Sequence, residues 1–206
     1  MPQRNDPNEE NIMNNIFSVF TIDQIDPFMT NLMEQYTIHA NGNAYQLLET
    51  ELYYHTEKTN TKHADTSVFE RNTKAQQFFF HAYGIDICFQ TSNDEKTYGG
   101  VLIRSIKNVK TGGTFCGPVN CHDEILRNMQ FDGDETFLRL RLVKSHTPQK
   151  LDLMKTPRIK GEKDDFDGKP YRYISKELYN EIIKRKNSDY YRKRLSEYEK
   201  KWGFEK

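Results

Sequence analysis

The residues with the clearest potential for chemistry lie in one short run, Glu49-Thr50-Glu51-Leu52-Tyr53. This run falls within a predicted strand from about Ala44 to Tyr54, so Glu51 and Tyr53 lie two positions apart on the same face. A carboxylate such as Glu51 can activate water and stabilise a developing positive charge. Taken alone, it is as readily an exposed strand glutamate or an ion-pair partner.

Two other groups contain residue types that bind metals. They are His55, His63 and Asp65, and Cys116, Cys121, His122 and Asp123. Neither has the paired Cys-x-x-Cys spacing typical of zinc sites, so we interpret both as incidental and expect no metal or other cofactor. Cys121 and His122 are adjacent, which places them badly as a nucleophile and base. The sequence contains no Walker-type or dinucleotide-binding glycine motif.

Turn signals and periodicity predict the elements that position this strand. Asp26-Pro27 predicts a helix through about Met33, with Asp26 as the N-cap and Pro27 in the first turn. Asn41-Gly42-Asn43 is a hairpin signal before the strand that carries Glu51. The segment from Gln77 to Ser92 is typical of β-structure, and Gly84 supplies the backbone freedom for a turn within it.

The rest of the chain continues this mixture of strands and helices. The further predicted strands are Gly99–Lys107, Phe137–Leu142 and Pro170–Ile174, and the further predicted helices are Cys121–Met129 and the basic segment from Ser175 to about Trp202. In the last helix, Leu178, Ile182 and Ile183 share one face.

The composition is that of a folded domain with polar ends. A length of 206 residues suits one domain. Hydrophobic residues make up only 35%, but aromatic residues reach 13%, whereas a disordered chain contains few aromatic residues. The net charge is zero, but residues 144–206 contain 18 Lys and Arg against 11 Asp and Glu. This segregation favours either a cationic face or solvated helix charges. The polar start, the three unpatterned cysteines and the lack of a long apolar run predict a cytoplasmic or nucleoid-associated protein without a membrane segment.

Seven short segments together resemble the alkyladenine (3-methyladenine) DNA glycosylase family. In chain order they are Glu49–Tyr53, His63-Ala64, Phe78–Gly84, Gly100–Ser105, Cys116-Gly117-Pro118, Thr156–Ile159 and Lys169–Tyr173. The specificity of the resemblance lies in their order and spacing, and it spans roughly residues 26–174.

The resemblance implies an α+β fold. This is a single mixed domain with a curved antiparallel β-sheet flanked by helices, of the kind shared with the C-terminal domain of formyltransferases. On this interpretation residues 1–15 are a flexible lead-in, residues 16–174 form the glycosylase-like domain and residues 175–206 form a basic helical extension.

The resemblance also implies a monofunctional enzyme that flips a damaged purine out of double-stranded DNA and hydrolyses its N-glycosidic bond. Glu51 matches the family's general base, and Arg104 matches the arginine that holds the water and keeps the carboxylate ionised. Tyr53, His63 and Phe80 match the aromatic walls around the flipped base, with Phe80 in place of the usual tyrosine.

Further positions follow from the same match. Tyr83, followed by Gly84, matches the wedge that fills the gap in the duplex, and Gln90 stands where the family usually has an asparagine that screens purine edges. Arg158, Lys169 and Arg172 are expected to make phosphate or structural contacts. The basic segment usual before the wedge is reduced, since residues 65–75 contain only Arg71 and Lys74 as cations.

Each of these positions also has a structural interpretation. These are ion pairs for Glu51 and Arg104, core packing for Phe80, a backbone-bonded loop histidine for His63, and a hairpin aromatic covering the core for Tyr83. The expected partner is duplex DNA containing damaged purines, bound by a monomer. Two alternative functions stay open: a catalytically silent binder of nucleic acid or modified bases, and an N-glycosidase acting on nucleosides or RNA.

Overall fold

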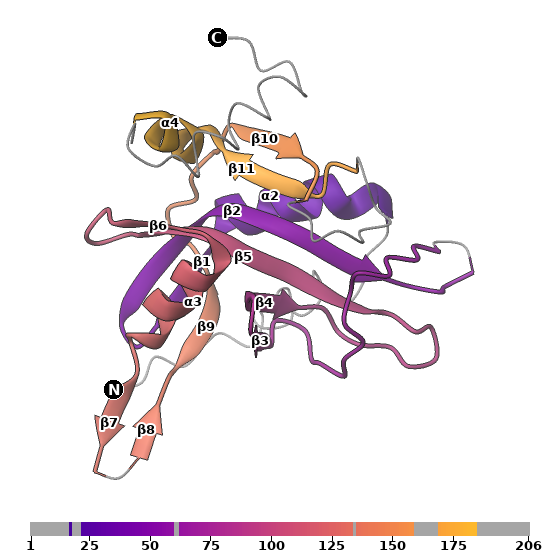
Figure 1. The fold of residues 1–206 in the computed structure, drawn as a ribbon, viewed down its shortest axis with the longest axis horizontal. Coiled ribbons are helices and arrows are strands. Elements are labelled where there is room, and N and C mark those ends of the chain that lie inside the picture. The colour runs from indigo at the N-terminus through magenta and orange to yellow at the C-terminus, as the bar shows by residue number, and fades with distance from the viewer. Residues whose placement is uncertain (1–16, 18–21, 60–61, 134, 159–168, 185–206) are drawn as a thin grey trace.

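A nine-stranded antiparallel sheet forms the body of the protein in a computed structural model that describes residues 17, 22–59, 62–133, 135–158 and 169–184 (Figure 1). Its strands are β1 Tyr36–Ala40, β2 Asn43–His55, β3 Phe78–His81, β4 Gly84–Cys88, β5 Tyr98–Asn108, β6 Thr114–Cys116, β9 Leu140–Lys144, β10 Leu153–Thr156 and β11 Arg172–Ser175. A separate hairpin consists of β7 Gln130–Asp132 and β8 Glu135–Phe137, and projects from the body. The helices are η1 Ile22–Gln24, α2 Ile25–Gln35, α3 Pro118–Leu126 and α4 Lys176–Lys184.

The long strand β2 organises the sheet. Its first half pairs with β1 and its second half with β11, while β5 runs along its other side. The pairing with β5 shifts register on either side of Glu49. Such bulges bend a strand and re-aim its side chains, and Figure 1 shows β2 and β5 curling together. The prediction of an α+β domain with a curved antiparallel sheet is therefore confirmed.

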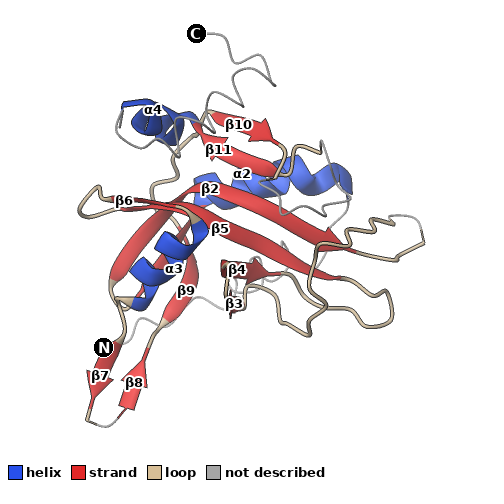
Figure 2. Ribbon diagram, in the orientation of Figure 1, coloured by secondary structure: helices blue, strands red, loops and turns tan. Residues whose placement is uncertain are grey.

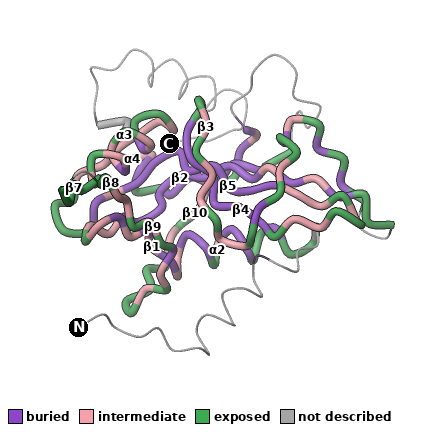
Figure 3. Tube along the Cα trace, turned by 90° about the horizontal axis from the view of Figure 1, so that it is seen from below, coloured by how far each residue is buried: buried purple, intermediate pink, exposed green. Residues whose placement is uncertain are grey.

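The core lies along the middle strands and under helix α2. Helix α2 contributes Phe28, Met29, Leu32 and Met33, which are all buried, as their helical spacing predicts. The buried trace follows β2 and β5 in Figure 3. Figure 2 shows α2 and α3 lying against the sheet at different places, and α4 beside β11. Within the described residues, no helix is both long and apolar enough to cross a membrane.

Both predicted hairpin turns are confirmed. The first has Asn41 and Gly42 at φ 43° and 91°, the left-handed region that asparagine and glycine tolerate. The second joins β3 to β4 at Gly84, with φ 142°. A β-carbon at Gly84 would lie 2.9 Å from the Pro118 β-carbon, so this turn needs glycine for space as well as for conformation.

Three predicted boundaries were wrong. Asp26 lies inside the first turn of α2, whose N-cap is Gln24, and its carboxylate accepts hydrogen bonds from Tyr173 and Lys155. Helix α3 begins at Pro118, three residues before the predicted start, as a proline at the first helical position allows. The predicted strand Phe137–Leu142 divides between β8 and β9.

The remaining predictions concern the two ends of the chain. The C-terminal helix is confirmed from Lys176 to Lys184, where Leu178 is buried. The rest of the predicted basic extension, from residue 185, and the lead-in at residues 1–15 lie outside the described residues.

Candidate functional site

Two glutamates on β2 lie side by side in the interior of the sheet. Glu49 and Glu51 are 5% and 0% exposed. Burying an ionised carboxylate is costly unless cations and hydrogen bonds compensate for the lost water. The arrangement therefore depends on the groups that neighbouring strands place against these two side chains.

Arg104, on β5, connects the two carboxylates. Its Nε donates to Glu49 Oε1 at 2.9 Å, and its Nη1 donates to Glu51 Oε2 at 3.2 Å. Burial alone would lower the pKa of Arg104, but the charges of Glu51 and Glu49 outweigh burial and raise it. The predicted proximity of Arg104 and Glu51 is what the structure shows, and the guanidinium is permanently charged.

Two arginines and a serine hold the Glu49 carboxylate. Arg172, on β11, approaches Glu49 Oε1 with Nε at 2.7 Å and Nη2 at 2.6 Å, and Ser105 donates to Oε2 at 2.7 Å. Burial would raise the pKa of Glu49, but the charges of Arg172 and Arg104 and the Ser105 hydrogen bond lower it to about 2. Glu49 is thus an ionised anchor that fixes both arginines beside Glu51.

Replacing Glu49 with glutamine is expected to cost stability in a pH-dependent way. The folded pKa of about 2 lies below the ordinary 4.5, so this carboxylate stabilises the fold above about pH 4.5 and loses that effect as the pH falls toward 2. The shift corresponds to about 3 kcal/mol at neutral pH. Urea unfolding at pH 3 to 7 should show a cost for Glu49→Gln that shrinks with acidity. The exposed-site control Glu135→Gln should show little cost, and an equal cost of Glu49→Gln at every pH would contradict this role.

Glu51 contacts Tyr53 as well as Arg104. The Tyr53 hydroxyl donates to Glu51 Oε2 at 3.0 Å. Burial and the adjacent charge of Glu51 raise the pKa of Tyr53, so its hydroxyl stays protonated and remains a donor. The same-face placement of Glu51 and Tyr53 predicted from their spacing is confirmed, and the two side chains touch.

Arg158 stacks its guanidinium on the ring of Tyr53. Its guanidinium lies 4.3 Å from the Tyr53 ring centroid, and Nη1 donates to Asp65 Oδ2 at 2.7 Å and to the Leu52 carbonyl at 3.1 Å. The side chains of Arg158 and Asp65 are 1% and 0% exposed. The loop that contains Asp65 is thereby tied to the strand that carries Glu51.

The three cations predicted to touch phosphate have different environments. Arg158 is paired with Asp65, and Arg172 is paired with Glu49 and lies 3.9 Å from Glu51. Their burial favours the structural alternative over phosphate contact, because a guanidinium that neutralises an interior carboxylate does not present itself at the surface. Lys169 is exposed, and its phosphate contact stays a prediction.

His63 lies next to this cluster. It is 3% exposed, with Nδ1 2.7 Å from the Tyr54 carbonyl and Nε2 2.7 Å from the Tyr171 hydroxyl. Burial lowers the pKa of His63. A carbonyl only accepts, so Nδ1 carries the proton and the neutral ring accepts from Tyr171 at Nε2. This is the backbone-bonded histidine that was the structural alternative, and its role as a base-stacking wall stays a prediction.

The predicted wedge lies on a different part of the sheet. Tyr83 is 67% exposed at the tip of the β3–β4 hairpin, and Phe80 is 39% exposed, with its ring 5.8 Å from that of His122. Phe80 is therefore not a core residue. The hairpin connects to the site through strand pairing, because Asp86 is opposite Leu102 and Leu102 is opposite Glu51.

Gln90 is exposed at the end of the strand region that follows this hairpin. Its side chain donates to the Thr91 carbonyl at 3.2 Å and accepts from the Ala75 backbone at 3.3 Å. It is thus held against local backbone, and its predicted role in screening the base is untested.

The structure adds three residues to the candidate site that the sequence did not assign to it. They are Glu49, Asp65 and Ser105, which fix the arginines and the loop around Glu51. The two-residue spacing of Glu49 and Glu51 was a usable signal for the first. Asp65 and Ser105 carry no such signal, because their partners are distant in the chain.

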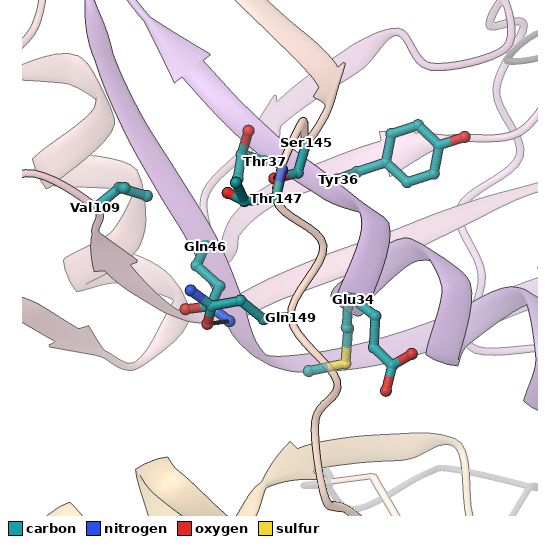
Figure 4. A pocket seen from close by; sticks show the side chains of 9 residues that line it. Glu34, Tyr36, Thr37, Gln46, Val109, Ser145, Thr147 and Gln149 are labelled. Carbon is teal, nitrogen blue, oxygen red and sulfur yellow. Dashed lines mark hydrogen bonds between the residues drawn. The ribbon is translucent and has the colours of Figure 1, made fainter.

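A small hollow of about 50 Å³ lies elsewhere, between the end of α2, the β1–β2 pair and the segment that follows β9 (Figure 4). Its wall includes Gln46 and Gln149, whose amides are joined by a 2.9 Å hydrogen bond. None of the site residues described above lines it. In the described part of the chain, no three His, Cys, Asp or Glu residues are grouped so that they could hold a metal ion.

Comparison with known proteins shows a similarity to a viral protein. No protein-family model matches the chain. An uncharacterized protein of Acanthamoeba polyphaga mimivirus is 27% identical over 213 residues, an alignment that covers 84% of this chain and 94% of the viral protein. The two are therefore similar over nearly their whole lengths.

Proposed function

We propose that this protein is a monofunctional DNA glycosylase that removes alkylated or deaminated purines, with Glu51 as the general base. The observation that carries the proposal is the geometry around Glu51: a fully buried carboxylate, 3.2 Å from Arg104 and 3.0 Å from the hydroxyl of Tyr53. The finer fold assignment, to the alkyladenine DNA glycosylase type, belongs to the same proposal and is supported by the ordered sequence segments.

The proposed reaction is hydrolysis at C1′ of the sugar. The bond between C1′ and the purine nitrogen breaks and its electron pair leaves with the base. Water attacks C1′, and Glu51 accepts a proton from that water while its negative charge stabilises the oxocarbenium-like transition state. Glu51 is fully buried, so the proposed reaction requires the site to open and admit water when the substrate binds.

Substrate preference follows from the charges of this cluster. Glu49, Glu51, Arg104 and Arg172 together sum to zero, and the described contacts assign no general acid to the leaving base. A cationic alkylated purine becomes neutral when it takes the electron pair, so it needs no proton. We therefore expect faster excision of 3-methyladenine than of hypoxanthine, which leaves less readily unless it is protonated.

The test is a substrate panel. Duplexes that contain 3-methyladenine, hypoxanthine or ethenoadenine are incubated with the full chain, and abasic sites and released bases are scored. The same lesions are supplied in single strands and as free nucleosides, with an undamaged duplex as the control. Release from at least one lesion duplex supports the proposal, and an inert protein across the whole panel overturns it. Release from nucleosides or single-stranded RNA alone indicates the N-glycosidase alternative.

A further inference from the structure

The outward face of the β1–β9 pair presents two arginines to solvent. Arg141 lies directly opposite His39 in the strand register, and the Arg139 backbone N–H donates to Asn41 Oδ1 at 2.8 Å. Arg139, one residue before β9, and Arg141, within it, are both exposed, whereas Leu142 is buried. The Arg-Leu-Arg-Leu pattern therefore displays two neighbouring exposed cations.

A hollow of about 340 Å³ opens at Arg139, and Arg141 lies next to it, opposite the lining residue His39. It is lined by His39, Asn41, Gly42, Gln130, Phe137 and Arg139. The Arg139 guanidinium lies 5.5 Å from the centroid of the Phe137 ring, a stacking that restricts where the charge can point. The Asn41 amide already donates to the carbonyls of Asn128 and Phe137, so Arg139 and Gln130 supply the hydrogen-bond donors of the hollow. Phe137 adds an aromatic face, and no lining residue is a carboxylate.

The two arginines of this face differ from the buried arginines of the candidate site in their partners. Among the described residues, no ion pair joins Arg139 or Arg141 to a carboxylate, whereas Arg104 is fully engaged in the interior. The hairpin acids Asp132 and Glu135 face each other at the hairpin's far end, beyond the Gln130–Phe137 pair.

The positive charge of Arg141 also acts on His39. Burial, followed by the positive charge of Arg141, lowers the pKa of His39. The imidazole is then neutral and the two guanidinium groups carry the charge of the hollow. A planar guanidinium fork matches the oxygens of a phosphate group.

We infer that this hollow binds a phosphate of a nucleic-acid backbone, with Arg139 and Arg141 as its charge contacts. The contact is independent of sequence, because backbone phosphates position a nucleic acid without reading its bases. The choice of nucleic acid as the phosphate source rests on the proposed function. The site adds an anchor for DNA outside the segment from residue 144 onward, where the basic residues are concentrated.

The test measures binding of an undamaged, labelled 20-base-pair duplex as a function of salt concentration. Each phosphate neutralised contributes about 0.9 to the slope of log affinity against log salt. The double variant Arg139→Gln/Arg141→Gln should lower that slope by about 0.9, the contribution of one phosphate, and Arg139→Lys should retain most of it. The control is Arg127→Gln, which removes an exposed arginine that is paired with Glu124 on α3.

Each outcome of this experiment decides the inference. An unchanged slope in the double variant overturns it, and so does an equal loss in Arg127→Gln, which would reflect net charge alone. If the two arginines are needed for binding inorganic phosphate but not for binding the duplex, the assignment to nucleic acid is overturned. The duplex is undamaged, so this binding experiment gives its result whether or not the protein has the proposed glycosylase activity.

Discussion

Replacing Arg158 with methionine is expected to destabilise the fold by about 3–5 kcal/mol, because it leaves the Asp65 carboxylate buried without its cation. The Arg158–Asp65 pair is 2.7 Å long, with both side chains nearly fully buried. The same change removes the cation stacked on the Tyr53 ring. Urea unfolding of the wild type and Arg158→Met measures the loss.

A double-mutant cycle separates the ion pair from lost packing. The Arg158→Met/Asp65→Asn protein should be less destabilised than the sum of its two single variants, since neither partner is then left charged alone. Arg127→Met removes an exposed helix ion pair and should cost less than about 1 kcal/mol. Additive single effects, or a loss from Arg158→Met no larger than that of Arg127→Met, would show that the pair does not hold the loop to β2.

Replacing Arg104 with methionine is expected to lower the single-turnover excision rate by on the order of 10²–10³-fold, the loss typical of one removed electrostatic contact. Arg104 touches both buried carboxylates, at 2.9 Å and 3.2 Å. Arg104 is one of the charges that lower the pKa of Glu49, so without it Glu49, which holds Arg172 beside Glu51, is protonated more readily. The acidic limb of the pH–rate profile should therefore move to higher pH.

The conservative variant Arg104→Lys distinguishes charge from geometry. It keeps a cation but loses the fork that reaches Glu49 and Glu51 together, so we expect an intermediate rate and a profile close to that of the wild type. A uniform loss of rate at every pH in Arg104→Met, matched by lost thermal stability, would assign Arg104 a purely structural role.

Local chemistry explains which parts of the fold were predictable. The Asn41-Gly42 turn and the Gly84 turn need backbone conformations that few residues adopt, so the two hairpins are readable from single positions. The alternation along β2 likewise predicts that Glu51 and Tyr53 share a face. Helix α3 begins earlier than predicted, because Pro118 has no backbone N–H to satisfy and fits the first helical position.

The ionic partners were not predictable, since topology decides them. Arg158 lies 93 residues from Asp65, and Arg172 lies 123 residues from Glu49. The sequence around either arginine does not show whether the side chain pairs with a buried carboxylate or contacts phosphate at the surface. The pairing of β11 with β2 supplies the missing information, because it sets Arg172 opposite Glu51.

The bulge at Glu49 is the feature that joins fold and site. It bends β2 at the point where the partner strand changes from β1 to β11. Arg104 contacts both glutamates there. Arg104, Arg172 and Ser105 hold Glu49, and Glu51 contacts Tyr53 of the proposed base pocket. We therefore propose an anchoring role for Glu49 and the general-base role for Glu51.

The most direct test of that assignment is the single-turnover release of free 3-methyladenine from duplex DNA by the wild type, Glu51→Gln and the exposed-site control Glu135→Gln. The wild type and the control should release the base at equal rates. Glu51→Gln should be slower by about 10²–10⁴-fold while binding the lesion duplex with similar affinity. Full activity in Glu51→Gln would contradict the assignment of Glu51 as the general base.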